Sequence, residues 1–193
     1  MKHFLIALLL LVPLAAAQAQ YEGPNLLGMF FSDTEFSEET ANHAPAPELF
    51  DAYFVLLNPE VDSVYGYEVG ISTTDPNCFF LYVTFPNNGD NFGNDMDHMV
   101  GYGTPVPVVD DVVILSTVTL LYVYSDYVEI SFGVSSLNSI PGHDGPVIAN
   151  GADPDDLIPC TIPSGEISGV VATLNGVVAV EHHSLTGVKA LFQ

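Results

Sequence analysis

The sequence predicts an all-β protein built as a single-domain β-sandwich. Short apolar segments rich in Val, Ile, Tyr and Phe recur along the chain, and Gly, Pro, Asn and Asp separate them, which is typical of strands joined by turns. No sustained helical period of apolar residues occurs before the C-terminal segment. No longer motif repeats along the chain. These observations favour a sandwich over a helical bundle, a solenoid or a propeller.

The chain begins with the pattern of a secretory signal peptide. Lys2 and His3 precede an apolar run over 4–14, and Ala17-Gln18-Ala19 matches a small-residue cleavage site. The apolar run is shorter than the roughly 20 residues that a membrane-spanning helix needs. We therefore predict a signal peptide at 1–19 and one mature domain at 20–193 without a transmembrane segment. The predicted location is secreted, whether periplasmic, at the cell surface or extracellular.

The mature region contains a series of segments with strand character. Asn175-Gly176 is a strong hairpin signal, because both residue types tolerate positive φ and apolar residues lie on either side. Asp110-Asp111 is expected to form a tight turn for the same reason. Strands are predicted at 25–32, 49–57, 64–73, 78–85, 105–109, 112–124 and 127–134, with two more within 169–180.

Alternation along some of these segments indicates which strand faces are buried. One face of 78–85 carries Phe79, Leu81, Val83 and Phe85, and one face of 127–134 carries Val128, Ile130, Phe132 and Val134. Segment 112–124 is apolar on both faces. This fits either a central strand that is covered on both sides or a strand that bends across two sheets.

The C-terminal segment differs from the rest because its apolar residues follow a helical period. Ser184 is suited to cap a short helix in which Leu185, Val188 and either Leu191 or Phe192 form one stripe. A frayed terminal turn is the alternative.

Cationic side chains are almost absent from this sequence. Asp and Glu number 24 against 2 Lys and Arg, so the formal net charge is −22 at pH 7, although 48% of the residues are hydrophobic. Such a chain cannot neutralise phosphates, which excludes nucleic-acid binding and electrostatic attraction to anionic lipid headgroups. We expect a neutral or cationic partner, either a protein or a glycan at the cell surface. Most carboxylates must be hydrated, hydrogen-bonded or bound to a metal ion.

The two cysteines are Cys78 and Cys160. In an exported chain, a lone pair of cysteines predicts a disulfide. Two separate buried thiols are the alternative.

Segment 89–98, with the sequence GDNFGNDMDH, is the best candidate for a functional loop. Oxygen-bearing side chains of the kind that calcium prefers come from Asp90, Asn91, Asn94, Asp95 and Asp97. The spacing does not match an EF-hand. The segment is therefore either a calcium site or a solvated turn in which Asn and Asp bond the backbone. The acidic segment 150–156 has similar chemistry.

We assign no catalytic residues. The serious candidates for acid–base chemistry are His98, His143, His182 and His183, but none of them lies in a nucleophile elbow or a metalloprotease motif. We expect these histidines to lie on the surface. The chain has no Trp, and its tyrosines are the rings available for stacking on sugars.

The stretch FDAYFVLLNPEVDSVYGYEVGIS, residues 50–72, combines an apolar strand ending in Asn-Pro with a Val-x-Gly-Tyr strand. It resembles the opening of cohesin-like and other immunoglobulin-like bacterial secreted modules. The segments HMVGYGTPVP, SSLNSIPG and GVKALFQ are similar to segments of exported proteins of environmental bacteria. The resemblance implies a β-sandwich, and it carries over no partner-binding residue.

Together these observations predict a secreted, non-catalytic β-sandwich with an interaction or structural role outside the cytoplasm. One alternative is a calcium-dependent glycan- or protein-binding module that uses segment 89–98. A secreted hydrolase is a further alternative.

Overall fold

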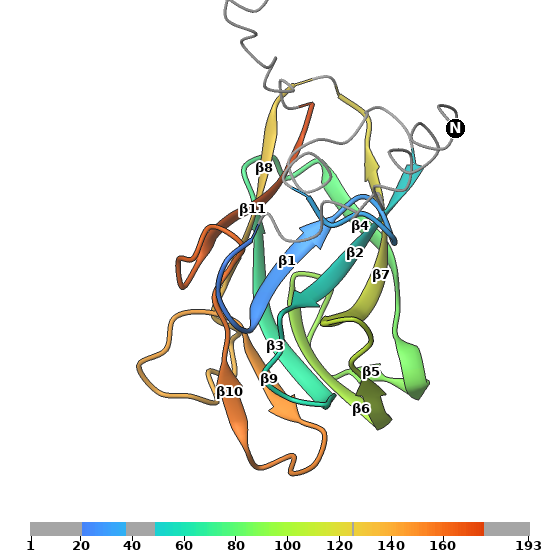
Figure 1. Ribbon diagram of the computed structural model, residues 1–193. Helices are drawn as coiled ribbons and strands as arrows, with labels where there is room; N and C mark the ends of the chain where they lie inside the picture. Colours follow the sequence, from blue (N-terminus) through green and yellow to red (C-terminus); the bar gives the residue numbers. More distant parts are fainter. Residues whose placement is uncertain (1–20, 38–48, 125, 176–193) are drawn as a thin grey trace, which may run out of the picture.

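The part of the chain described by the structure, a computed structural model, covers residues 21–37, 49–124 and 126–175, and its regular secondary structure is almost entirely β-strand (Figure 1). Its one helical element is a 3₁₀ turn, η1, at Pro86–Asn88. No helix within these residues has the length and apolar character needed to span a membrane. The predicted signal peptide, the second strand of the Asn175-Gly176 hairpin and the predicted C-terminal helix lie outside the described residues.

Four antiparallel strands form the first sheet, called sheet A here, in the order β1-β2-β7-β4. Tyrosine, valine, leucine and phenylalanine dominate these strands, which suits a pleated and largely buried surface. The strands are β1 Leu26–Phe30, β2 Leu49–Leu57, β7 Val112–Tyr122 and β4 Cys78–Thr84.

The second sheet, sheet B, has seven antiparallel strands and is built around β3. One side of β3 pairs with β6, and the other side pairs first with β9 and then with β8. The edges are formed by β5, β10 and β11. Their bounds are β3 Ser63–Thr73, β5 Asp90–Asn91, β6 Asp97–Pro107, β8 Val128–Gly133, β9 Val147–Asn150, β10 Leu157–Pro159 and β11 Gly169–Leu174.

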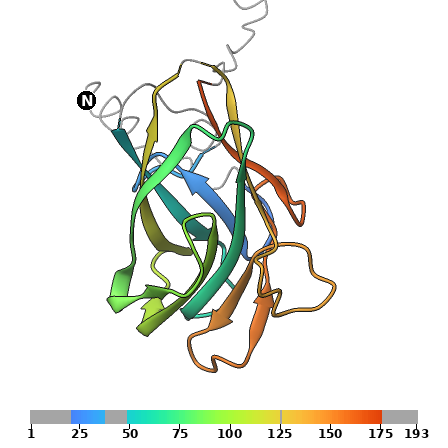
Figure 2. The same ribbon diagram turned by 180° about the vertical axis from the view of Figure 1, so that it is seen from behind.

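The two sheets pack face to face, which confirms the predicted β-sandwich (Figure 2). Their inner faces enclose one main apolar core, in which burying a large side chain stabilises the fold by about 1.5–3 kcal/mol. The largest fully buried side chains of this core include Met29, Phe54, Tyr67, Leu115, Tyr122, Ile130 and Phe132.

Strand β7 is a central strand that is covered on both faces. Val113, Leu115 and Val118 point into the main core. On the opposite face, Val112 and Ile114 pack against a smaller apolar cluster that contains Tyr21 and Phe30. The ring of Phe30 lies between those of Tyr21 and Phe36, at centroid distances of 6.0 and 5.4 Å. The N-terminal segment therefore covers part of the outer face of sheet A, which explains why β7 is apolar on both faces over its first residues.

The pattern predicted for β4 is half wrong because the strand contains a β-bulge. Its register against β7 shifts between Phe80 and Tyr82. Before the shift, Cys78 and Phe80 point into the core while Phe79 and Leu81 are exposed. After it, Val83 and Phe85 pack against the core as predicted. One extra residue in a strand moves the following side chains to the other face.

Several strands of sheet B were not predicted. The first seven residues of β6 include Asp97, Gly101 and Gly103, which strands disfavour, so the sequence predicted only the end of this strand. Strands β9 and β10 are four and three residues long. The Asp110-Asp111 turn is confirmed, because both residues have positive φ and Val109 bridges Val112.

The disulfide predicted between Cys78 and Cys160 is wrong: both are buried free thiols. Cys78 pairs with Tyr122 at the end of β7. Cys160 lies near the other end of β7. Its neighbour Thr161 forms a bridge with Leu26, and Leu26 pairs with Leu57. Leu57 in turn pairs with Val112, the first residue of β7. The length of β7, at about 3.3 Å per residue, separates the two ends. A disulfide needs Cα atoms within roughly 7 Å.

We predict that unfolded, non-reduced protein will titrate two thiols per chain. In the folded protein both thiols should react slowly at pH 8, because burial raises the pKa of Cys78 to about 11 and that of Cys160 to about 12. Titration with a chromogenic disulfide reagent, with and without denaturant, measures both quantities. If no thiol reacts in the unfolded, non-reduced protein, the two cysteines form a disulfide after all.

Candidate functional site

The outer face of sheet B contains a hollow of about 450 Å³, called the apolar hollow here. Its floor is a row of small residues on three neighbouring strands, in which Gly66 pairs with Ala149 on one side and with Gly101 on the other. A side chain at Gly66 has no room, because its Cβ would lie 2.3 Å from the carbonyl oxygen of Val100. The close approach of β3 and β6 therefore requires a glycine at position 66, and the missing side chain leaves space for the hollow.

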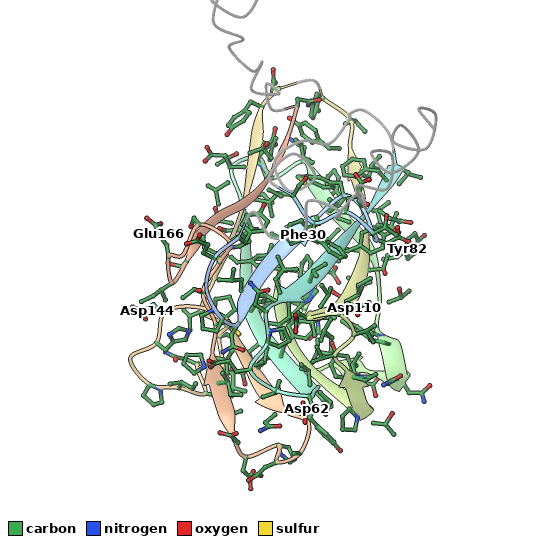
Figure 3. All side chains as sticks on the ribbon, in the orientation of Figure 1. Phe30, Asp62, Tyr82, Asp110, Asp144 and Glu166 are labelled. Atoms are coloured by element: carbon green, nitrogen blue, oxygen red, sulfur yellow. The ribbon has the colours of Figure 1, made fainter. Side chains whose placement is uncertain are left out.

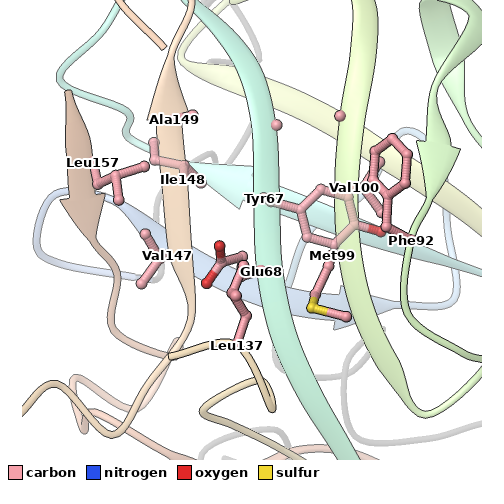
Figure 4. Close-up of a pocket in the computed structure, with 12 residues that line it drawn as sticks. Tyr67, Glu68, Phe92, Met99, Val100, Leu137, Val147, Ile148, Ala149 and Leu157 are labelled. Carbon is pink, nitrogen blue, oxygen red and sulfur yellow. The ribbon is translucent and has the colours of Figure 1, made fainter. Parts of the chain in front are cut away.

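Apolar side chains form the walls of this hollow. Figure 4 shows Val147 and Leu157 on one side and Met99 and Phe92 on the other. Leu137 reaches the hollow from the connection between β8 and β9. Phe92 is 77% exposed and Leu137 is 58% exposed. Large apolar side chains that gather in an accessible hollow indicate a binding surface.

Residues 135–139 cross the outer face of sheet B and form what we call the serine ridge. Glu68 of β3 accepts hydrogen bonds from the Ser139 hydroxyl at 2.6 Å and from the Ser135 hydroxyl at 3.4 Å. Asp97 of β6 accepts one from the Ser136 backbone N–H at 3.0 Å and another from the Ser136 hydroxyl. Two carboxylates on adjacent central strands therefore hold the ridge, and the ridge places Leu137.

Hydrogen bonds satisfy other carboxylates in the same way, and the described residues include no Lys or Arg. Asp51 accepts from the Thr119 hydroxyl at 2.7 Å. Asp75 accepts from the Asn77 backbone N–H at 2.8 Å, and this bond is the largest cause of its lowered pKa. Acidic side chains such as Asp62, Asp110, Asp144 and Glu166 lie around the periphery (Figure 3).

The residues of the predicted calcium loop lie on β5, on β6 and in the turn between them. Oδ1 of Asn91 accepts from the backbone N–H groups of Gly93 and Met99, and Oδ1 of Asn94 accepts from that of Met96. Asp97 binds the serine ridge, whereas Asp90 and Asp95 are exposed. No three His, Cys, Asp or Glu side chains of the described ranges are grouped as metal ligands. These contacts favour the hydrogen-bonded turn, which is one of the two alternatives that the sequence predicts for this segment.

His98 was expected on the surface, and this expectation is wrong. The side chain is fully buried on the inner face of β6, where its ring lies 5.1 Å from that of Phe54. Its Nδ1 lies 2.8 Å from the hydroxyl of Tyr67, which also donates to the Ser116 hydroxyl at 3.1 Å. Its Nε2 has no hydrogen-bond partner among the described residues. Alternation with Asp97 and Met99 was the signal that placed His98 inward.

The contacts of the other histidines do not indicate a catalytic role. His143 is half-buried, and its Nε2 lies 3.0 Å from the carbonyl oxygen of Pro146. His182 and His183 lie outside the described residues. Sequence reasoning missed Phe92 and Leu137 because each is an isolated apolar residue in a polar segment.

With this geometry established, comparisons with known proteins identify the fold. No family model matches the chain, and no curated protein matches it. The sixth cohesin of scaffoldin B from Acetivibrio cellulolyticus, solved in complex with a mutant Cel5 dockerin, has a TM-score of 0.50 and 5% identity. The match covers 80% of this chain and 100% of that one. This similarity confirms the predicted cohesin-like β-sandwich.

Two further cohesins are similar at lower scores. The second type II cohesin of the adaptor ScaA scaffoldin from the same organism has a TM-score of 0.45 and 14% identity, covering 80% of this chain and 98% of that one. The cohesin module of a Clostridium perfringens family 33 glycoside hydrolase has a TM-score of 0.42 and 12% identity, covering 78% and 98%.

We predict that sodium chloride will raise the melting temperature gradually, because it screens the repulsion among the carboxylates. Calcium at equal ionic strength should add no saturable increment, since oxygens of Asn91, Asn94 and Asp97 already accept hydrogen bonds. Thermal melts over both titrations test this. A saturable calcium increment, about 2.7 kcal/mol at a hundredfold excess over Kd, that disappears when Asp90, Asp95 and Asp97 become Asn would establish a site.

We also predict that His98 makes the fold acid-labile. Burial lowers the pKa of His98 to about 4, although the charge of Asp97 opposes this. As the pH drops, this imidazole is protonated at a higher pH in the unfolded chain than in the folded protein. The free energy of unfolding therefore falls by about 3 kcal/mol between about pH 6.5 and pH 4. Denaturant unfolding at pH 7 and pH 4.5 should show this loss in the wild type and not in His98→Leu. Carboxylate titration is common to both proteins, so identical pH dependence would refute the effect.

Proposed function

We propose that this protein is an exported, non-catalytic interaction module that binds a protein partner at the apolar hollow. The observation that carries the proposal is the accessible group of apolar side chains on the outer face of sheet B, above all Phe92 and Leu137. Burial of apolar side chains against a partner is the dominant favourable contribution to the free energy of most protein–protein association. The wide, open sheet around them suits a partner surface.

Charge supports a partner with cationic residues around an apolar anchor. The formal net charge is −22, and Glu68, Asp90 and Asp97 lie on the strands that form or border the apolar hollow. A like-charged surface is repelled, so a second copy of this chain is disfavoured. Complementary charge accelerates association and selects the partner.

The comparison with known structures supports the same class of function. The Acetivibrio cellulolyticus cohesin with a TM-score of 0.50 was solved with a dockerin bound. The N-terminal pattern of a signal peptide supports a partner outside the cytoplasm. A dockerin-like domain is one class of partner to test.

We predict that Phe92→Ser combined with Leu137→Ser will weaken partner binding by at least about tenfold, because each removes an exposed apolar anchor. The mature chain, immobilised, captures proteins from the extracellular fraction of its source, and each captured protein is then titrated by biolayer interferometry. Melting temperature should hardly change, because both side chains are largely exposed.

A matched control removes exposed apolar side chains from the other sheet. Leu49→Ser with Tyr82→Ser changes residues that are 62% and 70% exposed on sheet A. This control should bind like the wild type. Equal loss of binding in both double variants, or none in either, would reject the apolar hollow as the interface.

A further inference from the structure

The serine ridge separates the apolar hollow from a second hollow on the same outer face, called the polar hollow here. Its volume is about 700 Å³, within the range of about 300–1,000 Å³ that is common for small-ligand sites. Its floor is a pair of glycines, Gly70 of β3 and Gly133 of β8, which lie directly opposite each other. Gly70 must lack a side chain, because a Cβ there would lie 2.1 Å from the Val134 carbonyl oxygen.

Hydroxyl groups from several elements surround this floor. Ser72 and Ser131 are the next opposite pair along β3 and β8, so their side chains point to the same face as the glycines would. Ser168 adds a hydroxyl from the residue before β11. Within the described part of the chain, the side chains of these three serines make no hydrogen bond. Each hydroxyl is therefore able both to donate to a ligand and to accept from it.

Two carboxylates complete the lining. Asp97 is held by Ser136 of the serine ridge, whereas the carboxylate of Asp144 makes no hydrogen bond within the described ranges. The two negative charges disfavour an anionic ligand, and a ligand with an ammonium group gains a charge-assisted hydrogen bond.

We propose that the polar hollow binds an amine-bearing saccharide. The hydroxyl groups of a sugar match the free serine hydroxyls, an amino group matches Asp144, and the C–H face of a sugar ring suits the exposed flank of Val134 and the side chain of Met96. A bare divalent cation is a poorer match, because the described residues contain no group of three carboxylate, imidazole or thiol ligands. The site is independent of the protein interface proposed above.

The test uses isothermal titration of the mature chain with a β-1,4-linked disaccharide of glucosamine. Binding should be at least about tenfold weaker for the N-acetylated disaccharide, which lacks the ammonium group, and absent for a uronic acid disaccharide. Asp144→Asn should abolish the preference for the free amine. Equal affinity for the two glucosamine forms would overturn the assignment.

Two glycine substitutions separate the polar hollow from the apolar hollow. Gly133→Leu fills the polar hollow, and the nearest atom to its Cβ, in Ser168, lies 3.9 Å away, so the fold has room for it. Gly101→Leu fills the apolar hollow, where its Cβ lies 3.5 Å from the Phe92 ring. The first variant should lose the saccharide and keep the protein partner, and the second should do the reverse.

General attraction of a cation to this acidic protein is the competing explanation. Asp155→Asn removes the same unit of charge from the connection between β9 and β10, and it should leave saccharide affinity unchanged. If Asp155→Asn weakens binding as much as Asp144→Asn does, or if Gly133→Leu binds like the wild type while melting normally, the proposed site is wrong. Failure of this test leaves the result with Phe92 and Leu137 unaffected.

Discussion

The outer face of sheet B depends on hydrogen bonds between two carboxylates and the serine ridge. The described residues contain no Lys or Arg, and among them Glu68 and Asp97 accept hydrogen bonds from hydroxyl and backbone N–H groups of residues 135–139. A carboxylate on a central strand without such donors would have to remain hydrated. The arrangement fixes the β8–β9 connection across the sheet, so one set of contacts both satisfies the charges and shapes the two hollows.

The strands that sequence alone predicts best are those that border turn residues such as Asn, Pro and Asp, which mark where a strand begins or ends. The bounds of β2 match the prediction, and Asp110-Asp111 forms its turn. The hollows were not predictable in this way, because Gly66, Gly101 and Ala149 come together only through pairing between strands far apart in the sequence. The number of cysteines likewise does not indicate that Cys78 and Cys160 lie near opposite ends of β7 and are therefore too far apart to form a disulfide.

Buried polar groups inside the sandwich contrast with the satisfied carboxylates outside it. Tyr67, His98 and Ser116 share hydrogen bonds in the core, yet Nε2 of His98 has no partner within the described residues. An unpaired buried nitrogen costs about 1–3 kcal/mol. On the inner face of β6, His98 therefore lowers the stability of the fold. On the outer face of the same strand, Met99 lines the apolar hollow and Asp97 lines the polar hollow.

A single strand, β3, contributes to the floor of both hollows. Along β3, the inward residues Tyr67, Val69 and Ile71 belong to the core. The outward residues between them are Gly66 in the floor of the apolar hollow, Glu68 under the serine ridge, Gly70 in the floor of the polar hollow and Ser72 at its edge. Because strand side chains alternate between faces, the sequence GYEVGIS builds the core on one side while it sets the position of each hollow on the other. The same seven residues lie within residues 50–72, whose sequence resembles cohesin-like modules, so one short segment contributes both to the core of the sandwich and to the floors of the two hollows.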